Sequence, residues 1–422
     1  MRDAATPEPC EPFLLTAGQV IVAPDQPVLP RGAVLVTSDG RIGDVGPEAA
    51  MAERHQGTRR LEFPAATVLP GLINAHVHLA FEATADPVAA LRRGDHATVR
   101  GTIAAHARTL LDAGVTTVRD LGDRDGLVGE FRDQVAAGTA VGPRVLSAYA
   151  PLTSPQGHCW FLGGEVSGVS AVRAAVHEQA DRGADLIKLM AGGGRLTPLA
   201  APVWESQFSL EELRAAVETA HGRGLRVAAH AHGTDTMALC AEAGVDTIEH
   251  GGWLTGPTAE PRCYEPREDI ADLIADRGIA VCPTRFRNWR SWPPEAGLDG
   301  LMKRLAWMRS RGIALIAGTD AGVGNGKYDD LVEALGLYVA AGWSPSEALA
   351  LATTRGSAAL GRESDVGRVA QGCTADLLVV DGDPLADLEA LRAVQCVVAG
   401  GRLHHPHPVD PSSRRADLPG CC

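Results

Sequence analysis

The sequence predicts an α/β protein built around a (β/α)8 TIM barrel, with a small β-sandwich domain formed from both termini. Three observations lead to this fold class. Strand-like runs alternate with amphipathic helical stretches from residue 67 to about residue 365, whereas residues 12–66 contain short strand-like runs only. Strand-like segments return after residue 365. Eight strand–helix units over about 250 residues are typical of such a barrel.

The N-terminal part of the chain is expected to form a small β unit. Its candidate strands are residues 13–22, 32–37 and 41–45. The turn Ser38-Asp39-Gly40 separates the last two, and no helical period runs through this stretch. We therefore assign residues 12–66 to the terminal β domain and expect residues 1–11 to be a disordered tail.

The barrel is expected over residues 67–365. Its predicted strands are residues 67–78, 116–121, 144–148, 186–190, 226–231, 247–251, 280–284 and 314–320. The helix candidates between them are residues 99–112, 169–182, 209–223, 269–277 and 300–311. Ser209 followed by Glu212 is a capping-box signature. Several helices end in Ala-Gly or Arg-Gly, as at Arg223-Gly224, because glycine is favoured just after a helix.

Two further helices, residues 329–341 and 344–361, are expected to lead from the barrel back to strands. Those strands are residues 375–380 and 394–403. We assign residues 366–405 to the β-sandwich, paired with residues 12–66. The last stretch, residues 406–422, is rich in proline, serine and charge and is expected to be a disordered tail.

Composition narrows the class of protein. The 422 residues carry a net charge of −13, from 39 basic and 52 acidic side chains, and no basic block suggests a nucleic-acid partner. No apolar run is long enough to span a membrane, and the first residues lack an apolar signal core. The nine cysteines include no CxxC pair. We therefore expect a cytoplasmic protein with reduced thiols and a small-molecule substrate.

Metal-competent side chains stand at the ends of several predicted barrel strands. Side chains at the C-terminal strand ends of such a barrel converge on one face, and strand residues two apart point to the same side. Alone, a His-x-His pair is equally consistent with packed or surface histidines. The joint placement predicts a metal site. Its candidate members are His76, His78, Lys188, His230, His232, His250 and Asp320.

Lys188 stands alone in the apolar run of the fourth predicted strand. A buried ammonium group is costly unless it is paired, and desolvation lowers its pKa. A neutral amine can take up CO2 and form a carbamate, which is an anionic ligand able to bridge two cations. A salt bridge with an acid such as Asp320 is the alternative. The residues alone leave both readings open.

Several segments together resemble the amidohydrolase superfamily. They are residues 70–78 with their two histidines, Lys188, His230, His250 and Gly318-Thr319-Asp320. Residues 114–120, 246–251 and 375–380 narrow the likeness to the imidazolonepropionase-like and Xaa-Pro dipeptidase (prolidase)-like branch with a carboxylated lysine. The likeness extends from about residue 14 to residue 403.

The resemblance implies a distorted barrel, a β-sandwich from both termini and a binuclear site, usually of zinc. His76, His78 and Asp320 would hold the first ion. His230 and His250 would hold the second, with N6-carboxylysine at Lys188 as the bridge. The implied reaction is attack of a metal-bridging hydroxide on an amide C–N bond. Asp320 would accept the proton of the water and return it to the leaving nitrogen.

His232 faces the same pocket as His230, one strand period further on. It would donate to the scissile carbonyl oxygen or, equally, only orient a metal ligand. Members of this branch with a carboxylated lysine commonly cleave dipeptides or N-acyl amino acids. His158, in Gln156-Gly157-His158, is similar to the histidine of a GGH segment of the family, although the first glycine is missing.

The loop after the seventh predicted strand is the main candidate for substrate recognition. Arg285, Arg287 and Arg290, beside two tryptophans, suit a carboxylate next to an apolar group. An exposed lid or a subunit contact of a homo-oligomer is the other reading of this loop. Tyr264 is a further candidate.

Two other functions remain open at this point. A cyclic amide, lactone or carbamate hydrolase would use the same binuclear site. A non-catalytic binding member of the family should have lost metal ligands, and none is missing from this sequence.

Overall fold

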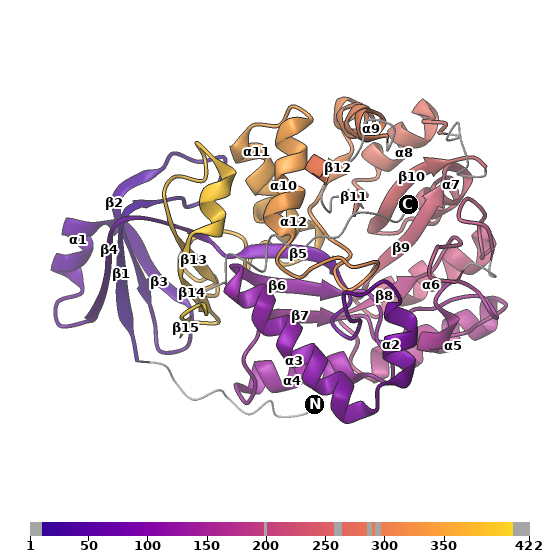
Figure 1. The fold of residues 1–422 in the computed structure, drawn as a ribbon, viewed down its shortest axis with the longest axis horizontal. Helices are drawn as coiled ribbons and strands as arrows, with labels where there is room; N and C mark the ends of the chain where they lie inside the picture. The colour runs from indigo at the N-terminus through magenta and orange to yellow at the C-terminus, as the bar shows by residue number, and fades with distance from the viewer. Residues whose placement is uncertain (1–10, 198–200, 257–263, 285–288, 292–296, 408–422) are drawn as a thin grey trace.

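The structure is a computed structural model that describes residues 11–197, 201–256, 264–284, 289–291 and 297–407. It confirms the predicted fold class: an α/β barrel carries an additional sheet built by the two ends of the chain (Figure 1). Nearly all of the two predicted tails, residues 1–11 and 406–422, lies outside the described residues.

The additional sheet joins segments that are far apart in the sequence. Within the described residues it has seven strands in the order β15-β14-β13-β4-β1-β2-β3, antiparallel except for β1 with β4. The strands are β1 (Phe13–Val20), β2 (Leu29–Val36), β3 (Ile42–Pro47), β4 (Arg59–Pro70), β13 (Leu377–Asp381), β14 (Val394–Ala399) and β15 (Arg402–His404). The N-terminal strands and the C-terminal strands therefore need each other to complete the sheet.

Both faces of this sheet are covered, which explains the continuous apolar run at its first strand. Phe13 and Leu15 point into a core that also receives Val379 of β13. Leu14 points to the opposite face, against Met51 of helix α1 (Glu48–Arg54). Alternation of side chains along a strand produces this division.

The run at residues 67–78, expected as one strand, is divided by the structure at Gly71. β4 continues past residue 66, where we expected the terminal domain to end, as far as Pro70, which pairs with Leu377. The first barrel strand then begins at Leu72. A Cβ atom on Gly71 would lie 2.2 Å from Oγ1 of the buried Thr116, so only glycine fits this link between the two sheets.

The barrel is formed by eight strands in the described part of the chain. They are β5 (Leu72–Val77), β6 (Val115–Asp120), β7 (Arg144–Ser147), β8 (Leu186–Leu189), β9 (Arg226–Gly233), β10 (Thr247–Leu254), β11 (Ala280–Cys282) and β12 (Ala314–Leu315). Parallel ladders pair neighbouring strands within two groups. One group is β5, β6 and β7, and the other is β8, β9, β10, β11 and β12. Single bridges, Leu152 with Leu189 and Val77 with Ala321, close the two seams. The barrel is thus distorted where the ladders are interrupted.

Helices lie around the outside of the barrel and pack side by side (Figure 1). They are α2 (Pro87–Arg93), α3 (His96–Asp112), α4 (Leu127–Ala137), α5 (Val169–Asp181), α6 (Leu210–Gly222), α7 (Thr234–Ala243), α8 (Glu268–Asp276), α9 (Leu298–Ser310), α10 (Leu331–Ala340), α11 (Pro345–Leu351) and α12 (Thr354–Ala359). Short 3-10 helices are η1 (Trp160–Leu162), η2 (Trp289–Ser291) and η4 (Leu388–Arg392).

The helix signals in the sequence have the physical basis expected of them. Ser209 and Glu212 form the predicted capping box at the start of α6. The same helix buries Leu213, Val217 and Ala220, which recur at helical spacing and face the barrel core. Among the described residues, no helix is both long and apolar enough to cross a lipid bilayer.

We predict that Gly71→Ala destabilises the protein by roughly 1–3 kcal/mol, the usual cost of overpacking a close contact. The new methyl group would meet Thr116 at the junction of the two sheets. Urea denaturation followed by circular dichroism measures the effect. Gly101→Ala is the matched control: Gly101 lies in α3 with nothing within 4 Å of its Cβ position, so the change should be neutral or stabilising. Equal stability of the two variants would contradict the packing argument.

Candidate metal centre and active site

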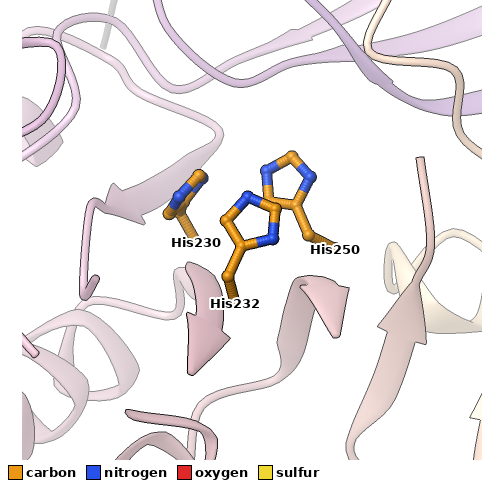
Figure 2. Close-up of side chains that lie close together, drawn as sticks. All are labelled: His230, His232 and His250. Carbon is orange, nitrogen blue, oxygen red and sulfur yellow. The ribbon is translucent and has the colours of Figure 1, made fainter. Parts of the chain in front are cut away.

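Five histidines meet at the C-terminal ends of three barrel strands. His76 and His78 lie at the end of β5, His230 and His232 at the end of β9, and His250 in β10. Figure 2 shows the last three grouped together. The ring centroids of His230 and His250 are 4.4 Å apart, and those of His76 and His250 are 5.2 Å apart. The structure therefore brings together histidines that are up to 174 positions apart in the sequence.

Asp320 completes this group from the segment that follows β12. Its Oδ1 lies 3.2 Å from Nε2 of His76 and 3.3 Å from Nε2 of His78. Asp320 and His250 both adopt left-handed backbone conformations, with φ of 56° and 73°. Such conformations are uncommon outside glycine and are found where the surrounding structure enforces them. Here they turn two strand ends so that both side chains face the site.

Four of these imidazole rings are anchored through one nitrogen. The contacts are His76 Nδ1 to Glu249 Oε2 at 2.8 Å, His78 Nδ1 to the Gly122 carbonyl at 3.2 Å, His230 Nε2 to the Gly193 carbonyl at 3.0 Å and His250 Nδ1 to Thr284 Oγ1 at 2.6 Å. A carbonyl or carboxylate acceptor fixes the proton on the bonded nitrogen and leaves the lone pair on the other. His76, His78 and His230 therefore each keep one nitrogen for a cation, whereas the Thr284 hydroxyl can either accept from His250 or donate to it.

The protonation states also suit a cation. Burial lowers the pKa of His230 and of His250 well below the ordinary range, so both rings are neutral at pH 7. Burial opposes ionisation of Asp320, but the neighbouring His76 and His78 outweigh it and hold the Asp320 pKa well below its usual value. Neutral imidazoles and an ionised carboxylate are the forms that bind metal ions.

Lys188 is almost completely buried in β8, with 1% of its surface exposed. The alternative salt bridge with Asp320 is not made, because Asp320 pairs with His76 and His78. Within the described part of the chain, no carboxylate oxygen lies within 4.0 Å of the Lys188 amine. Burial lowers the pKa of this amine. The amine therefore has reduced basicity and forms no ion pair with any of the residues that the structure describes.

A buried ion pair, not recognised in the sequence, supports His76 from behind. Glu249 accepts hydrogen bonds from Arg119 Nη2 at 2.7 Å and from Thr247 Oγ1 at 2.6 Å, and its other oxygen contacts His76. Arg119 also donates to the carbonyl of Ala75 at 2.7 Å. Burial would raise the pKa of Glu249, but Arg119 outweighs it and keeps the carboxylate ionised. The sequence signal that could have identified this pair is a charged residue within each of two strands, Arg119 in β6 and Glu249 in β10.

Cys282 of β11 lies near the same pair. Its Sγ, one carboxylate oxygen of Glu249 and one ring nitrogen of His76 are within 4.8 Å of one another. Burial raises the pKa of the Cys282 thiol well above its usual value, which keeps the sulfur protonated. Because a thiol binds metal ions as its thiolate, this trio is better explained as packing behind His76 than as a metal site.

His158 is brought to the cluster by the loop that follows β7. Its ring centroid lies 4.6 Å from that of His230, and its Nδ1 is 2.8 Å from Thr197 Oγ1. Burial lowers the His158 pKa to about 3, so the ring is neutral. A Cβ atom on Gly194 would lie 2.2 Å from this ring. The glycine run after β8 is therefore what admits His158.

Of the other residues predicted to recognise the substrate, the structure places some near the histidines and others away from them. Tyr264 and His232 line one pocket, which also borders His250. Arg290 of η2 is instead paired with Glu333 and Glu389, and the structure does not bring it to the histidines. Arg285 and Arg287 lie outside the described residues.

Residues 67–404, most of the chain, match the amidohydrolase family. The chain belongs to this family. This amidohydrolase is 27% identical to ochratoxinase of Aspergillus niger over 435 aligned positions, which cover 92% of this chain and 86% of that protein. It is 27% identical to imidazolonepropionase of Salinispora tropica over 370 positions, which cover 83% and 86%.

A solved structure supports the same placement. The crystal structure of a Xaa-Pro dipeptidase with methionine bound in its active site aligns with this amidohydrolase at a TM-score of 0.81 and 27% identity. The alignment covers 93% of this chain and 100% of that one. The similarities place the chain in the prolidase-like branch of the superfamily and identify it as a hydrolase.

Amidohydrolases generally use divalent metal ions, and the donor set fits such ions. Two trios each bring three potential ligand atoms within 4.8 Å of one another. The trios are His76, His78, Asp320 and His230, His232, His250. Imidazole nitrogens with a few carboxylate oxygens are typical ligands of zinc and its neighbours. In the second trio, His232 joins His230 and His250, the two residues that the resemblance assigned to the second ion.

We predict that Glu249→Gln weakens metal binding by about 10–100-fold, because a neutral amide neither balances Arg119 nor holds the His76 ring as a carboxylate does. Titration of the metal-depleted protein, monitored by calorimetry, measures this affinity. Glu218→Gln is the matched control, since Glu218 of α6 forms an exposed ion pair with Arg173 of α5. Unchanged metal affinity in Glu249→Gln would show that the buried pair does not support the ligand.

Proposed function

We propose that this amidohydrolase cleaves the amide bond of a small substrate that carries a carboxylate, such as a dipeptide or an N-acyl amino acid. The observation that carries the proposal is the convergence of buried, anchored imidazoles and the Asp320 carboxylate at one end of the barrel, beside a pocket that His232 and His250 line. A Xaa-Pro dipeptidase, which by name acts on dipeptides, is among the structures that this chain resembles.

The proposal includes two divalent ions, with zinc expected. His76, His78 and Asp320 would hold one ion, and His230 and His250 the other. Lys188 would lie between them as a carboxylated lysine; its burial, lowered pKa and lack of a carboxylate partner among the described residues support this role. When bound, two such ions would activate water as a nucleophile and polarise the scissile carbonyl.

The side chains of the protein would then manage the protons and the substrate. Asp320 is ionised at neutral pH, so it can accept the proton of the attacking water and return it to the leaving nitrogen. His232 lies against His250, with stacked rings 4.4 Å apart, and borders the pocket. We assign it the hydrogen bond to the substrate carbonyl oxygen.

The function is tested by incubating the metal-loaded protein with N-acyl amino acids, dipeptides, lactones and cyclic ureides. We expect hydrolysis of the first two classes, and a loss of about 100-fold or more in kcat for Asp320→Asn with little change in KM, because an amide cannot accept the proton. Asp181→Asn, on an exposed part of α5, is the control. A normal kcat in Asp320→Asn would contradict the assigned base. Hydrolysis confined to lactones or cyclic ureides would select the alternative function.

A separate prediction concerns Lys188. Lys188→Ala should lose bound metal and activity together, because the cavity would no longer contain a bridging anion. Bicarbonate with a short carboxylic acid should partly restore both, since the added carboxylate can occupy the vacated space. Elemental analysis and kinetics measure the two effects. A metal-loaded crystal structure with an unmodified Lys188 amine would contradict the carboxylated form.

A further inference from the structure

The chain turns away from β5 immediately after His78, through residues 79–81. His78 and the three residues of this turn are all buried. One hydrogen bond forms within the turn, from Phe81 N to the His78 carbonyl at 3.1 Å. Because buried N–H and C=O groups need partners, the other groups of the turn must be satisfied by distant parts of the chain. Those partners determine where the His78 side chain begins.

Tyr328, from the loop that follows Asp320, reaches this turn through its hydroxyl group. The hydroxyl oxygen lies 2.7 Å from the carbonyl oxygen of His78 and 2.6 Å from that of Phe81, so one donor serves two acceptors. The Tyr328 side chain is itself buried. The hydroxyl therefore joins the first and the last residue of the turn.

His106 of α3 keeps Tyr328 in place and contacts the same turn. The two rings are stacked, with their centroids 3.9 Å apart and their planes inclined by 18°. Nδ1 of His106 donates to the carbonyl of Leu79 at 3.0 Å. A side chain that is already ordered by packing loses little conformational entropy when it holds a partner. The hydroxyl of Tyr328 is thus positioned before any ion arrives.

Asp120, at the end of β6, holds the amide side of the turn. Its Oδ2 accepts a hydrogen bond from Leu79 N at 2.7 Å, and its Oδ1 accepts one from Gly122 N at 3.1 Å. The carbonyl of Gly122 is the group that accepts from Nδ1 of His78, at 3.2 Å. One buried carboxylate therefore fixes both the backbone beyond His78 and the acceptor that orients its ring.

The loop that carries Tyr328 has to approach the turn closely. A Cβ atom on Gly322 would lie 2.6 Å from the Tyr328 hydroxyl oxygen and 2.7 Å from the His78 carbonyl oxygen, and Gly322 has a φ of 97°. A side chain at this position would push the two groups apart, and glycine alone adopts such a conformation easily. The loop that supplies the Asp320 carboxylate therefore also returns to hold the ligand on the neighbouring strand.

We propose that Tyr328 and Asp120 are positioning residues that fix His78 before a metal ion binds and so set the affinity of the first ion site. The inference rests on the proposed function, which assigns His78 to the first ion, and it names what holds that ligand. Glu249 supports the ring of His76 in the same site. Tyr328 and Asp120 would perform the corresponding task for His78, mainly through its backbone.

The first test measures zinc affinity. Zinc is titrated by calorimetry into the metal-depleted wild-type protein and into Tyr328→Phe, which keeps the stacked ring and removes only the hydroxyl. We expect the dissociation constant of one binding event to rise about 10-fold, as when a group that supports a metal ligand is removed, and any second event to change little. Wild-type zinc affinity in a Tyr328→Phe protein that is folded by circular dichroism would overturn the proposal.

Tyr149→Phe is the matched control. The Tyr149 hydroxyl also donates to a backbone carbonyl, that of Arg182 at 3.2 Å, at the C-terminal end of α5. The two variants lose the same group from a buried ring. Both should lower the thermal unfolding midpoint, and only Tyr328→Phe should weaken zinc binding. An equal effect of the two variants on zinc affinity would contradict a specific role for Tyr328.

Asp120→Asn provides a second, independent variant. An amide accepts hydrogen bonds through its oxygen only, so asparagine can serve one of the two N–H groups that the carboxylate holds. We expect the same zinc binding event to weaken as in Tyr328→Phe. Asp181→Asn, on an exposed part of α5, is its control. If both Asp120→Asn and Tyr328→Phe lower the unfolding midpoint but bind zinc normally, the two residues only stabilise the fold and the proposal fails.

A third measurement requires no variant. Hydrogen–deuterium exchange followed by mass spectrometry compares residues 77–82 in the metal-depleted and the zinc-loaded wild-type protein. We expect slow exchange in both forms, because Asp120 and Tyr328 hold the turn without the ion. Fast exchange that becomes slow only when zinc is added would show that the ion orders this segment, and it would overturn the proposal.

Kinetics separate this inference from the proposed function. When zinc saturates the weakened site, kcat of Tyr328→Phe on N-acetyl-L-leucine should return close to the wild-type value, because the hydroxyl takes no part in the reaction. A kcat that stays low at saturating zinc would contradict a positioning role. Weakened zinc binding in a protein that hydrolyses no amide would refute the proposed function and leave this inference standing. Amide hydrolysis with unchanged zinc affinity in both variants would do the reverse.

Discussion

The seam between β5 and the segment after β12 is the constraint on which the site depends. Hydrogen bonds from Asp320 N to the His76 carbonyl at 2.9 Å and from His78 N to the Ala321 carbonyl at 3.0 Å close the barrel there. The Asn74 side chain ties the same seam to Thr319 in both directions, as donor at 2.8 Å and acceptor at 3.1 Å. Closing the barrel and assembling His76, His78 and Asp320 are therefore one event.

This seam tolerates little variation. A Cβ atom on Gly318 would lie 2.8 Å from Cβ of His76 and 2.5 Å from Sγ of Cys282, so the Gly-Thr-Asp segment can approach β5 only because its first residue has no side chain. The left-handed backbone at Asp320 then turns its carboxylate toward the histidines. A small residue and a strained one, two positions apart, together make the site possible.

Beneath the histidines, the barrel interior holds charges that a structural core would avoid. Arg119, Lys188 and Glu249 are each at most 3% exposed. Burial of a charge is costly even when it is paired, and replacement of such pairs by apolar residues is often neutral or stabilising in other proteins. Their presence is best explained by function: Glu249 anchors the ring of His76, Arg119 balances Glu249, and Lys188 supplies an amine of lowered pKa in the same space.

The sequence alone determined the fold class and the candidate metal-binding residues, because both depend on local periodicity. Strand alternation places His76 with His78 and His230 with His232, and the barrel rule puts His250 and Asp320 at the same face. Only the tertiary structure decided what surrounds them. Arg119 and Glu249 are 130 positions apart, and the stacking of Arg304 on Tyr264 joins a helix to a loop, so no local pattern connects either pair. Contacts of this kind arise from how the closed barrel packs its strands and helices together.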